Sequence, residues 1–294
     1  MGKVYKALTK LESEQPQGSL AATVVAGEEA RAKANGDQIV DDFDFIRYSL
    51  NTPSAEELEQ TQHEAGNNSF AHGRALRPAR EITLDVSRID PHLVTFYDFD
   101  PRAAEEYSKM AITLISSVAE QPIKRVLIAS AQHGEGRTCV ALNLACALAQ
   151  AKQRVLVVDT DLRSPSLLRL LGAESDVGIA EALTRELPAN AAAIEIEPYG
   201  FAVLPMRERM ENSAEILASP AFRSMLNSFE PDYDFMLFDS SPLLESNDAN
   251  LLMKLTNATV MVIRPGKTSA GQISKAIAPL AEDNILGVVL NRAD

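Results

Sequence analysis

The sequence has no run of basic residues, no metal-ligand spacing among its histidines and only two cysteines in 294 residues. With a formal net charge of -13, it lacks the clustered lysines and arginines that bind phosphate backbones, so we expect no nucleic-acid partner. The scattered His63, His72 and His92 exclude an obvious zinc site. Cys139 and Cys146 are seven residues apart in one helical pattern, which favours packing over a disulfide and indicates a reducing compartment.

Segments that could enter or cross a membrane are also lacking. No window approaches the roughly 18 consecutive apolar residues of a transmembrane helix. The first residues, MGKVYKALTKLESEQ, lack the apolar core of a signal peptide. We therefore expect a cytoplasmic protein, which a partner would recruit if it works at the inner face of the plasma membrane.

Composition divides the chain into an N-terminal extension, residues 1–80, and a folded domain, residues 81–294. At the start, Val4, Leu8 and Leu11 share one helical face, which predicts a short amphipathic helix. The polar segment that follows, up to about residue 79, has little periodicity, so we expect a largely disordered linker.

The folded domain begins with short patterned segments. EITLDVSRI and LVTFYDF have the alternation and the β-branched residues of strands. PRAAEEYSKMAITLISSVAE predicts a helix that begins at its proline, with Met110, Leu114 and Val118 along one side.

From residue 125 onward, short apolar runs alternate with helical patterns. The runs are RVLIAS, RVLVVD, FAVLP, DFMLFD, ATVMVI and ILGVVLN, and the helical patterns include TCVALNLACALAQ, PAFRSMLNSF and GQISKAIAPLAE. This alternation predicts a doubly wound α/β domain with a mostly parallel sheet covered on both faces.

The segment AQHGEGRT follows a predicted buried strand directly and opens a predicted helix, which is the context of a phosphate-binding loop. Gly134 and Gly136 allow backbone N–H groups to curl around phosphate oxygens. Thr138 stands where a hydroxyl would bind Mg²⁺. The loop departs from GxxxxGK[ST] at Ala131 and Arg137, so a tight turn without a ligand is the alternative.

Acidic residues end two further predicted strands. RVLVVDTDLRSPS runs into Asp159, Asp161 and Arg163, and YDFMLFDSSP places Asp239 at a strand end. Carboxylates there face the ligand crevice of an α/β sheet, where they can hold Mg²⁺ or orient an attacking hydroxyl. The alternative for Asp161 is a cap of the following turn.

These motifs, with ENSAEILASPAFRSML and the terminal GVVLNRAD, resemble the cytoplasmic domain of bacterial tyrosine kinases of the capsule and exopolysaccharide type, the CpsD/CapB family. The resemblance covers roughly residues 90–294 and implies a P-loop NTPase fold and ATP-dependent transferase activity. It implies a Walker A loop formed by Gly134, Glu135, Gly136, Arg137 and Thr138, and Cys139, which follows, is a further candidate for binding the nucleotide.

The same resemblance implies roles for the other site residues. Asp159 and Asp161 would be the Walker A′ carboxylates, with Asp161 activating the acceptor hydroxyl, and Arg137 would assist catalysis. Thr138, Asp161 and Asp239 would hold Mg²⁺. Arg264 and Asn291, at the ends of the last two strands, match positions near the nucleotide base.

Kinases of this type work beside a membrane-spanning, Wzz-type polysaccharide co-polymerase, which the resemblance implies as a partner in a separate chain. Three departures favour a catalytically impaired scaffold as the alternative. Arg137 replaces the loop lysine, the arginines of the family's subunit interface read Ser108 and Ala111, and the last tyrosine is Tyr233. A homo-oligomer would therefore have an altered interface. A third hypothesis, a MinD/ParA-type ATPase, usually requires a lysine early in the loop, where SAQHGEG has none.

Overall fold

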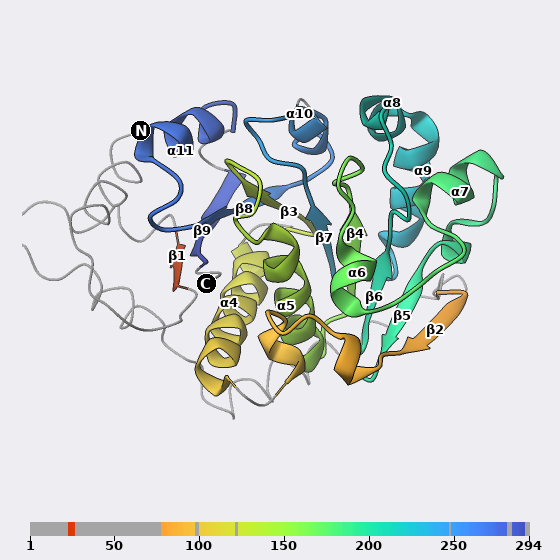
Figure 1. Ribbon diagram of the computed structural model, residues 1–294, viewed down its shortest axis with the longest axis horizontal. Coiled ribbons are helices and arrows are strands. Elements are labelled where there is room, and N and C mark those ends of the chain that lie inside the picture. The colour runs from red at the N-terminus through yellow and green to blue at the C-terminus, as the bar shows by residue number, and fades with distance from the viewer. Residues whose placement is uncertain are drawn as a thin grey trace, which may run out of the picture. The chain divides into compact units, whose positions relative to one another are not determined.

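The computed structural model of the chain describes residues 23–26, 78–97, 100–120, 123–246, 248–280 and 284–291. These residues form a sheet with helices on both faces (Figure 1). The doubly wound α/β architecture expected from the sequence is confirmed. The predicted helix at residues 1–12 lies outside the described residues, and the boundary between residues 80 and 81 stays a prediction.

In the described residues, nine strands form one sheet in the order β1-β9-β8-β3-β7-β4-β6-β5-β2. Neighbours from β9 to β6 run parallel, whereas β1 and β5 pair antiparallel with β9 and β6. The strands are β1 (Thr23–Ala26), β2 (Arg80–Thr83), β3 (Arg125–Ser130), β4 (Val155–Asp159), β5 (Ile194–Glu197), β6 (Phe201–Leu204), β7 (Phe235–Asp239), β8 (Ala258–Ile263) and β9 (Ile285–Leu290).

The helices divide between the two faces of the sheet. They are α4 (Pro101–Glu120), α5 (Arg137–Gln150), α6 (Leu167–Leu171), α7 (Ile179–Thr184), α8 (Ser213–Ala218), α9 (Pro220–Phe229), α10 (Asp248–Leu252) and α11 (Ala270–Ile277). Helices α4, α5 and α6 share one apolar cluster with the sheet, and α7 to α11 share the other.

Strand β3 shows why continuous apolar runs become central strands. Val126 and Ile128 pack with α4 and α5, whereas Leu127 and Ala129 pack into the opposite cluster. Successive side chains of a strand point to opposite faces, so a strand covered on both sides must be apolar throughout. The polar loop that follows β3 therefore begins where the buried strand ends, at the carboxyl end of the central strands.

Some local predictions were wrong or incomplete. Leu93 to Tyr97 does not form the predicted strand, because the Thr95 N–H is bonded by the Asn143 side chain of α5 at 3.0 Å, and a 3₁₀ turn (Val94–Phe96) forms instead. Val118 does not join Met110 and Leu114 in the core and is 37% exposed.

Two chain segments also differ from their predicted extents. Helix α11 ends at Ile277, ahead of the predicted end, because Pro279 has no N–H to continue it. Strand β1 falls in the segment that was assigned to the linker.

Candidate functional site

The carboxyl ends of β3, β7 and β4 lie side by side at one edge of the sheet. Asp159 and Asp239 are register partners on the parallel strands β4 and β7. The N–H and hydroxyl groups of Thr160 both donate to the Asp239 carbonyl, at 2.9 and 2.6 Å. The strand ends are thereby tied together, and two of the predicted acidic residues are neighbours.

The loop between β3 and α5 has the backbone of a phosphate-binding turn. Gly134 and Gly136 have φ angles of +77° and +91°, a region that L-residues avoid. Glu135 is fully buried, and its carboxylate accepts hydrogen bonds from the Gln132 N–H at 2.7 Å and from the Thr268 hydroxyl. The Glu135 side chain therefore shapes the loop from inside, and any contact with a nucleotide would fall to its backbone.

Asn291 lies against this loop. Its side-chain amide donates to the Glu135 carbonyl at 3.0 Å, and its N–H donates to the Ile263 carbonyl at 2.8 Å. Arg264 follows β8 and is half-buried, and its carbonyl accepts the N–H of Lys267 at 3.2 Å. The structure thus brings the end of β9 to the loop, and the position of Asn291 near a nucleotide base stays a prediction.

Arg137 turns toward the ends of β3, β7 and β4 and is 6% exposed. Its Nε donates to the Ser240 carbonyl at 2.7 Å, and Nη1 donates to the Ser130 hydroxyl and, at 3.1 Å, to the Gln132 carbonyl. Its Nη2 lies 3.3 Å from Oδ2 of Asp161. The planar fork of the guanidinium is thus bound on several sides by the protein itself.

Asp161 is the acidic partner of this buried ion pair and is 5% exposed. Burial raises the pKa of its carboxyl, and the Arg137 charge opposes that rise. Its Oδ1 also accepts the N–H of Ser164 at 3.2 Å. Asp161 therefore caps the following turn, as the alternative interpretation proposed, and also faces the loop residue Arg137.

Asp159 and Asp239 are fully buried. Burial raises the pKa of Asp239 to about 7, against the opposing effects of Arg137 and of the Thr138 hydroxyl. Burial, and then the charges of Asp239 and Asp161, hold the Asp159 pKa well above its usual range. The N–H groups of Leu167 and Asp161 oppose this rise, but neither forms a well-shaped hydrogen bond to the carboxylate.

Hydroxyl groups complete the arrangement. Thr138, in the first turn of α5, donates to Oδ2 of Asp239 at 2.7 Å, and its oxygen is 2.9 Å from the Ser166 hydroxyl oxygen. Thr138 and Asp239 are two of the three residues to which the resemblance assigned Mg²⁺, and the third, Asp161, is paired with Arg137. Because the Thr138 hydroxyl and the Asp239 carboxylate lie within hydrogen-bond distance, one ion could contact both.

The residues present fit a Mg²⁺-bound nucleotide. Both carboxylate oxygens of Asp159 and Oδ1 of Asp239 are buried without a hydrogen-bond partner, which is costly unless a cation or water can reach them. No three His, Cys, Asp or Glu side chains in the described ranges form a metal cluster by themselves. Mg²⁺ at such sites typically takes one or two protein ligands and completes its shell with phosphates and water.

Comparisons with known proteins identify the family. A family model described as ParA, NUBPL iron-transfer P-loop NTPase, matches residues 122–293. The chain belongs to this family of P-loop NTPases. The P-loop NTPase is 29% identical over 207 residues to the tyrosine-protein kinase YwqD of Bacillus subtilis, a match that covers 70% of the chain and 87% of YwqD.

A second relative and a solved structure agree with this match. The P-loop NTPase is 27% identical to the succinoglycan biosynthesis transport protein ExoP of Rhizobium meliloti, over 65% of the chain but 25% of ExoP. The kinase domain of the Escherichia coli tyrosine kinase ETK superimposes with a TM-score of 0.64 at 26% identity, covering 70% of the chain and 83% of that domain. The resemblance to bacterial tyrosine kinases is confirmed.

Several contacts of the P-loop NTPase had no signal in a single sequence. Glu245, in the loop after β7, accepts the His133 N–H at 2.9 Å, and Lys267, in the loop after β8, donates to the His133 carbonyl at 3.1 Å. His133 itself is exposed. Cys139 is half-buried, and burial, helped by Asp90 and Asp239, raises the pKa of its thiol to about 12, so it stays a neutral thiol.

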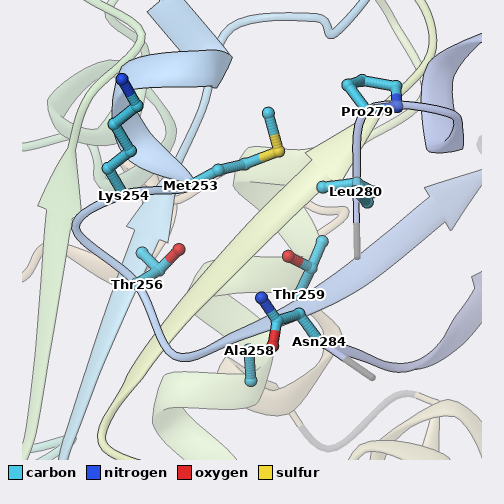
Figure 2. A pocket seen from close by; sticks show the side chains of 8 residues that line it. All are labelled: Met253, Lys254, Thr256, Ala258, Thr259, Pro279, Leu280 and Asn284. Carbon is cyan, nitrogen blue, oxygen red and sulfur yellow. The ribbon is translucent and has the colours of Figure 1, made fainter. Parts of the chain in front are cut away.

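A cavity beside the central strands of the P-loop NTPase lies away from these residues. It has a volume of about 320 Å³ and is lined by residues around the start of β8 and the end of α11, among them Met253, Thr259 and Leu280 (Figure 2). The loop lies at the opposite, carboxyl end of the strands. The candidate site is therefore a surface of loop and strand ends, not this cavity.

Among the described helices, none combines the length and apolarity that crossing a bilayer requires.

Gly136→Ala is expected to lower the free energy of unfolding by about 2–4 kcal/mol, because left-handed strain and overpacking each contribute. A Cβ at Gly136 would lie 2.0 Å from the side-chain nitrogen of Asn291. Gly266→Ala is the matched control, because Gly266 has a φ of +75° and open space around its Cβ position. We expect Gly266→Ala to lower the free energy of unfolding by about 1–2 kcal/mol, from backbone strain alone. Equal losses in urea unfolding would show that the Asn291 contact does not constrain the loop.

Proposed function

We propose that this chain is an ATP-binding protein of the bacterial tyrosine-kinase type that uses Mg²⁺. The observation that supports binding best is the set of buried, unpartnered oxygens of Asp159 and Asp239 beside the Thr138 hydroxyl. The turn at Gly134 and Gly136 leads into the N-terminal end of α5, where N–H groups favour phosphate. Thr138 and Asp239 would hold the ion, and Asn291 and Arg264 would lie toward the base.

Mg·ATP would supply the transferable phosphoryl group, and the protein would supply position and charge. Asp161 is the residue we assign to accept the proton of an acceptor hydroxyl, with Asp159 beside it. This role needs an accessible, basic carboxylate. The ion pair with Arg137 occupies Oδ2 of Asp161 and makes that carboxylate a weaker base.

The same ion pair favours the second candidate function, a nucleotide-binding scaffold with little transfer activity. Arg137 donates to Ser240, Gln132, Ser130 and Asp161, so four of its five N–H groups are taken and only one is left for a phosphate unless these bonds break. The third hypothesis, a surface-cycling ATPase, has less support. At the position of its early lysine this chain carries Gln132, whose N–H is held by Glu135.

The acceptor is another open element of the proposal. The tyrosines in the described residues are Tyr97, Tyr107, Tyr199 and Tyr233, and all are buried or half-buried. Burial raises the pKa values of Tyr107 and Tyr233 above their usual range. We therefore infer that phosphate transfer, where it occurs, goes to another protein or to Tyr5 or Tyr48, which lie outside the described residues.

We also propose a role in exopolysaccharide or capsule synthesis and export. The chain would act in the cytoplasm, at the inner face of the membrane, beside a Wzz-type co-polymerase in a separate chain. The support is the name of the relative ExoP, a succinoglycan biosynthesis transport protein, of which this chain spans 25%. On helix α4 the exposed Ser108 and the buried Ala111 stand where the family's interface arginines would lie, so any homo-oligomer would use other contacts.

The enzyme and scaffold hypotheses are separated by phosphotyrosine formation and ADP release from Mg·ATP. We would compare the wild type with Arg137→Lys and Asp161→Asn, each with the cytoplasmic segment of the candidate membrane partner. Arg137→Lys is expected to release ADP at least about 10-fold faster than the wild type, because lysine reaches phosphates as a compact charge. Asp161→Asn is expected to be slower by about 100-fold, the usual contribution of a general base.

The outcomes divide the hypotheses. Wild-type turnover that Asp161→Asn abolishes supports a working kinase. Silence in the wild type with activity in Arg137→Lys supports the scaffold. Silence in all three variants, together with no binding of Mg·ATP, would contradict both forms of the proposal.

A further inference from the structure

Arg137, the cation within the phosphate-binding loop, is bound mainly by other groups of the protein. Its Nε donates to the Ser240 carbonyl, and its Nη1 donates to the Gln132 carbonyl and the Ser130 hydroxyl. Its Nη2 pairs with Asp161. The usual loop cation instead meets the β- and γ-phosphates of a bound nucleotide. In this chain four of the five N–H groups of Arg137 are bound to the protein, so most of the hydrogen bonding to these phosphates is left to other residues.

A second cation reaches the same loop from a distant part of the chain. Lys267 is exposed in the loop between β8 and α11, and its Nζ donates to the His133 carbonyl at 3.1 Å. The same Nζ lies 2.9 Å from the position that a Cβ on Gly134 would take. The ammonium group therefore stands directly against the glycine turn.

The local structure around Lys267 holds it in this place. Its N–H donates to the Arg264 carbonyl at 3.2 Å, and Gly266, with a φ of +75°, makes the turn possible. The next residue, Thr268, donates its hydroxyl to Glu135 inside the phosphate-binding loop. The two loops are thus joined at two points, on either side of Gly134.

The chemistry of this ammonium suits phosphate. An ammonium has three donors, and the His133 carbonyl uses one of them, so donors remain for phosphate oxygens. Arg163, another cation near the strand ends, is bound to Asp248 at 3.3 Å and to the Ser213 hydroxyl at 3.1 Å. Glu245 accepts the His133 N–H and so places a negative charge beside the same residue. A cation must offset this charge before phosphate can approach.

We propose that Lys267 takes the place of the missing loop lysine and binds the β- and γ-phosphates of the nucleotide. The inference rests on the proposed binding of Mg·ATP at this loop. It differs from a purely structural role, in which Lys267 would only hold the His133 carbonyl.

The test is calorimetric binding of Mg·ATP, Mg·ADP and AMP to the full chain and to charge variants. Lys267→Gln removes the charge but keeps an N–H donor for the His133 carbonyl. It is expected to weaken binding of Mg·ATP and Mg·ADP by about 10- to 100-fold, as for the loss of one charge-assisted hydrogen bond, and binding of AMP by less than about 3-fold. Lys267→Arg should retain most of the affinity. Lys275→Gln, an exposed lysine on α11, is the matched control and should bind like the wild type.

Three results would overturn the proposal. If the wild type binds Mg·ATP and Lys267→Gln binds it equally well, Lys267 does not contact phosphates, although the proposed function stands. Equal weakening of ATP and AMP binding would assign Lys267 a structural role in the loop. If the wild type binds no nucleotide at all, the proposed function fails and this inference fails with it. Thermal unfolding of each variant shows whether the fold is retained.

Discussion

Arg137→Met is expected to lower the free energy of unfolding by about 3–5 kcal/mol, the range for removing one partner of a buried ion pair. The loss leaves the Asp161 carboxylate, which is 5% exposed, without its counter-charge. It also leaves the Ser240 and Gln132 carbonyls without the donors that Arg137 supplies. Urea unfolding near pH 8 measures the change, since Asp161 is then ionised in the unfolded chain.

Two further variants make this prediction specific. Adding Asp161→Asn to Arg137→Met should recover most of the lost stability, because no unpaired charge then remains. Arg154→Met breaks a pair with Asp234 at the surface, where the two side chains are 53% and 36% exposed. It should cost less than about 1 kcal/mol. A loss of that small size in Arg137→Met, or no recovery in the double variant, would contradict a buried ion pair at the site.

Asp239→Asn is expected to stabilise the nucleotide-free protein by about 2–4 kcal/mol at pH 8 while greatly weakening its binding of Mg·ATP. Asp239 has a pKa raised to about 7 by burial. Asparagine can still accept the Thr138 hydroxyl, but it carries no charge into the buried site. The same substitution removes a carboxylate that we assign to Mg²⁺.

The sign of the pH effect follows from the direction of the shift. The folded protein holds the Asp239 proton more tightly than the unfolded chain does. The stability gained from that proton is present at low pH and is lost between about pH 4 and pH 7. The raised pKa of Asp159 adds to the trend. The free energy of unfolding of Asp239→Asn, measured in urea without Mg²⁺, should therefore exceed that of the wild type by more at pH 8 than at pH 5. A constant difference across this range would contradict the raised pKa.

The central part of the fold was predictable because its strands are buried on both faces. The apolar runs of β3, β4, β7 and β8 mark such strands without ambiguity, and their polar ends mark the edge of the sheet. The proximity of Asp159 and Asp239 follows from the same rule, because neighbouring parallel strands end together. Outside this core, the short segment IEIE forms strand β5, and its four residues are too few to predict a strand.

The direction of side chains in the site was not predictable from local pattern. Arg137 turns inward because its acceptors come from three separate strand ends, which only the folded sheet brings together. The segment at Thr95 forms a turn because Asn143, 48 residues away, takes its N–H. Lys267 reaches His133 across 134 residues of chain. Contacts of this kind depend on the tertiary structure and leave no periodicity in the sequence.

The most direct test of this account is calorimetric titration of the wild-type chain with Mg·ATP at pH 8, with Asp239→Asn titrated in parallel. We predict saturable binding of one nucleotide per chain in the wild type and a loss of that binding in the variant. The absence of saturable binding in the wild type would contradict the account, because the unpartnered oxygens of Asp159 and Asp239 would then serve no nucleotide-bound cation.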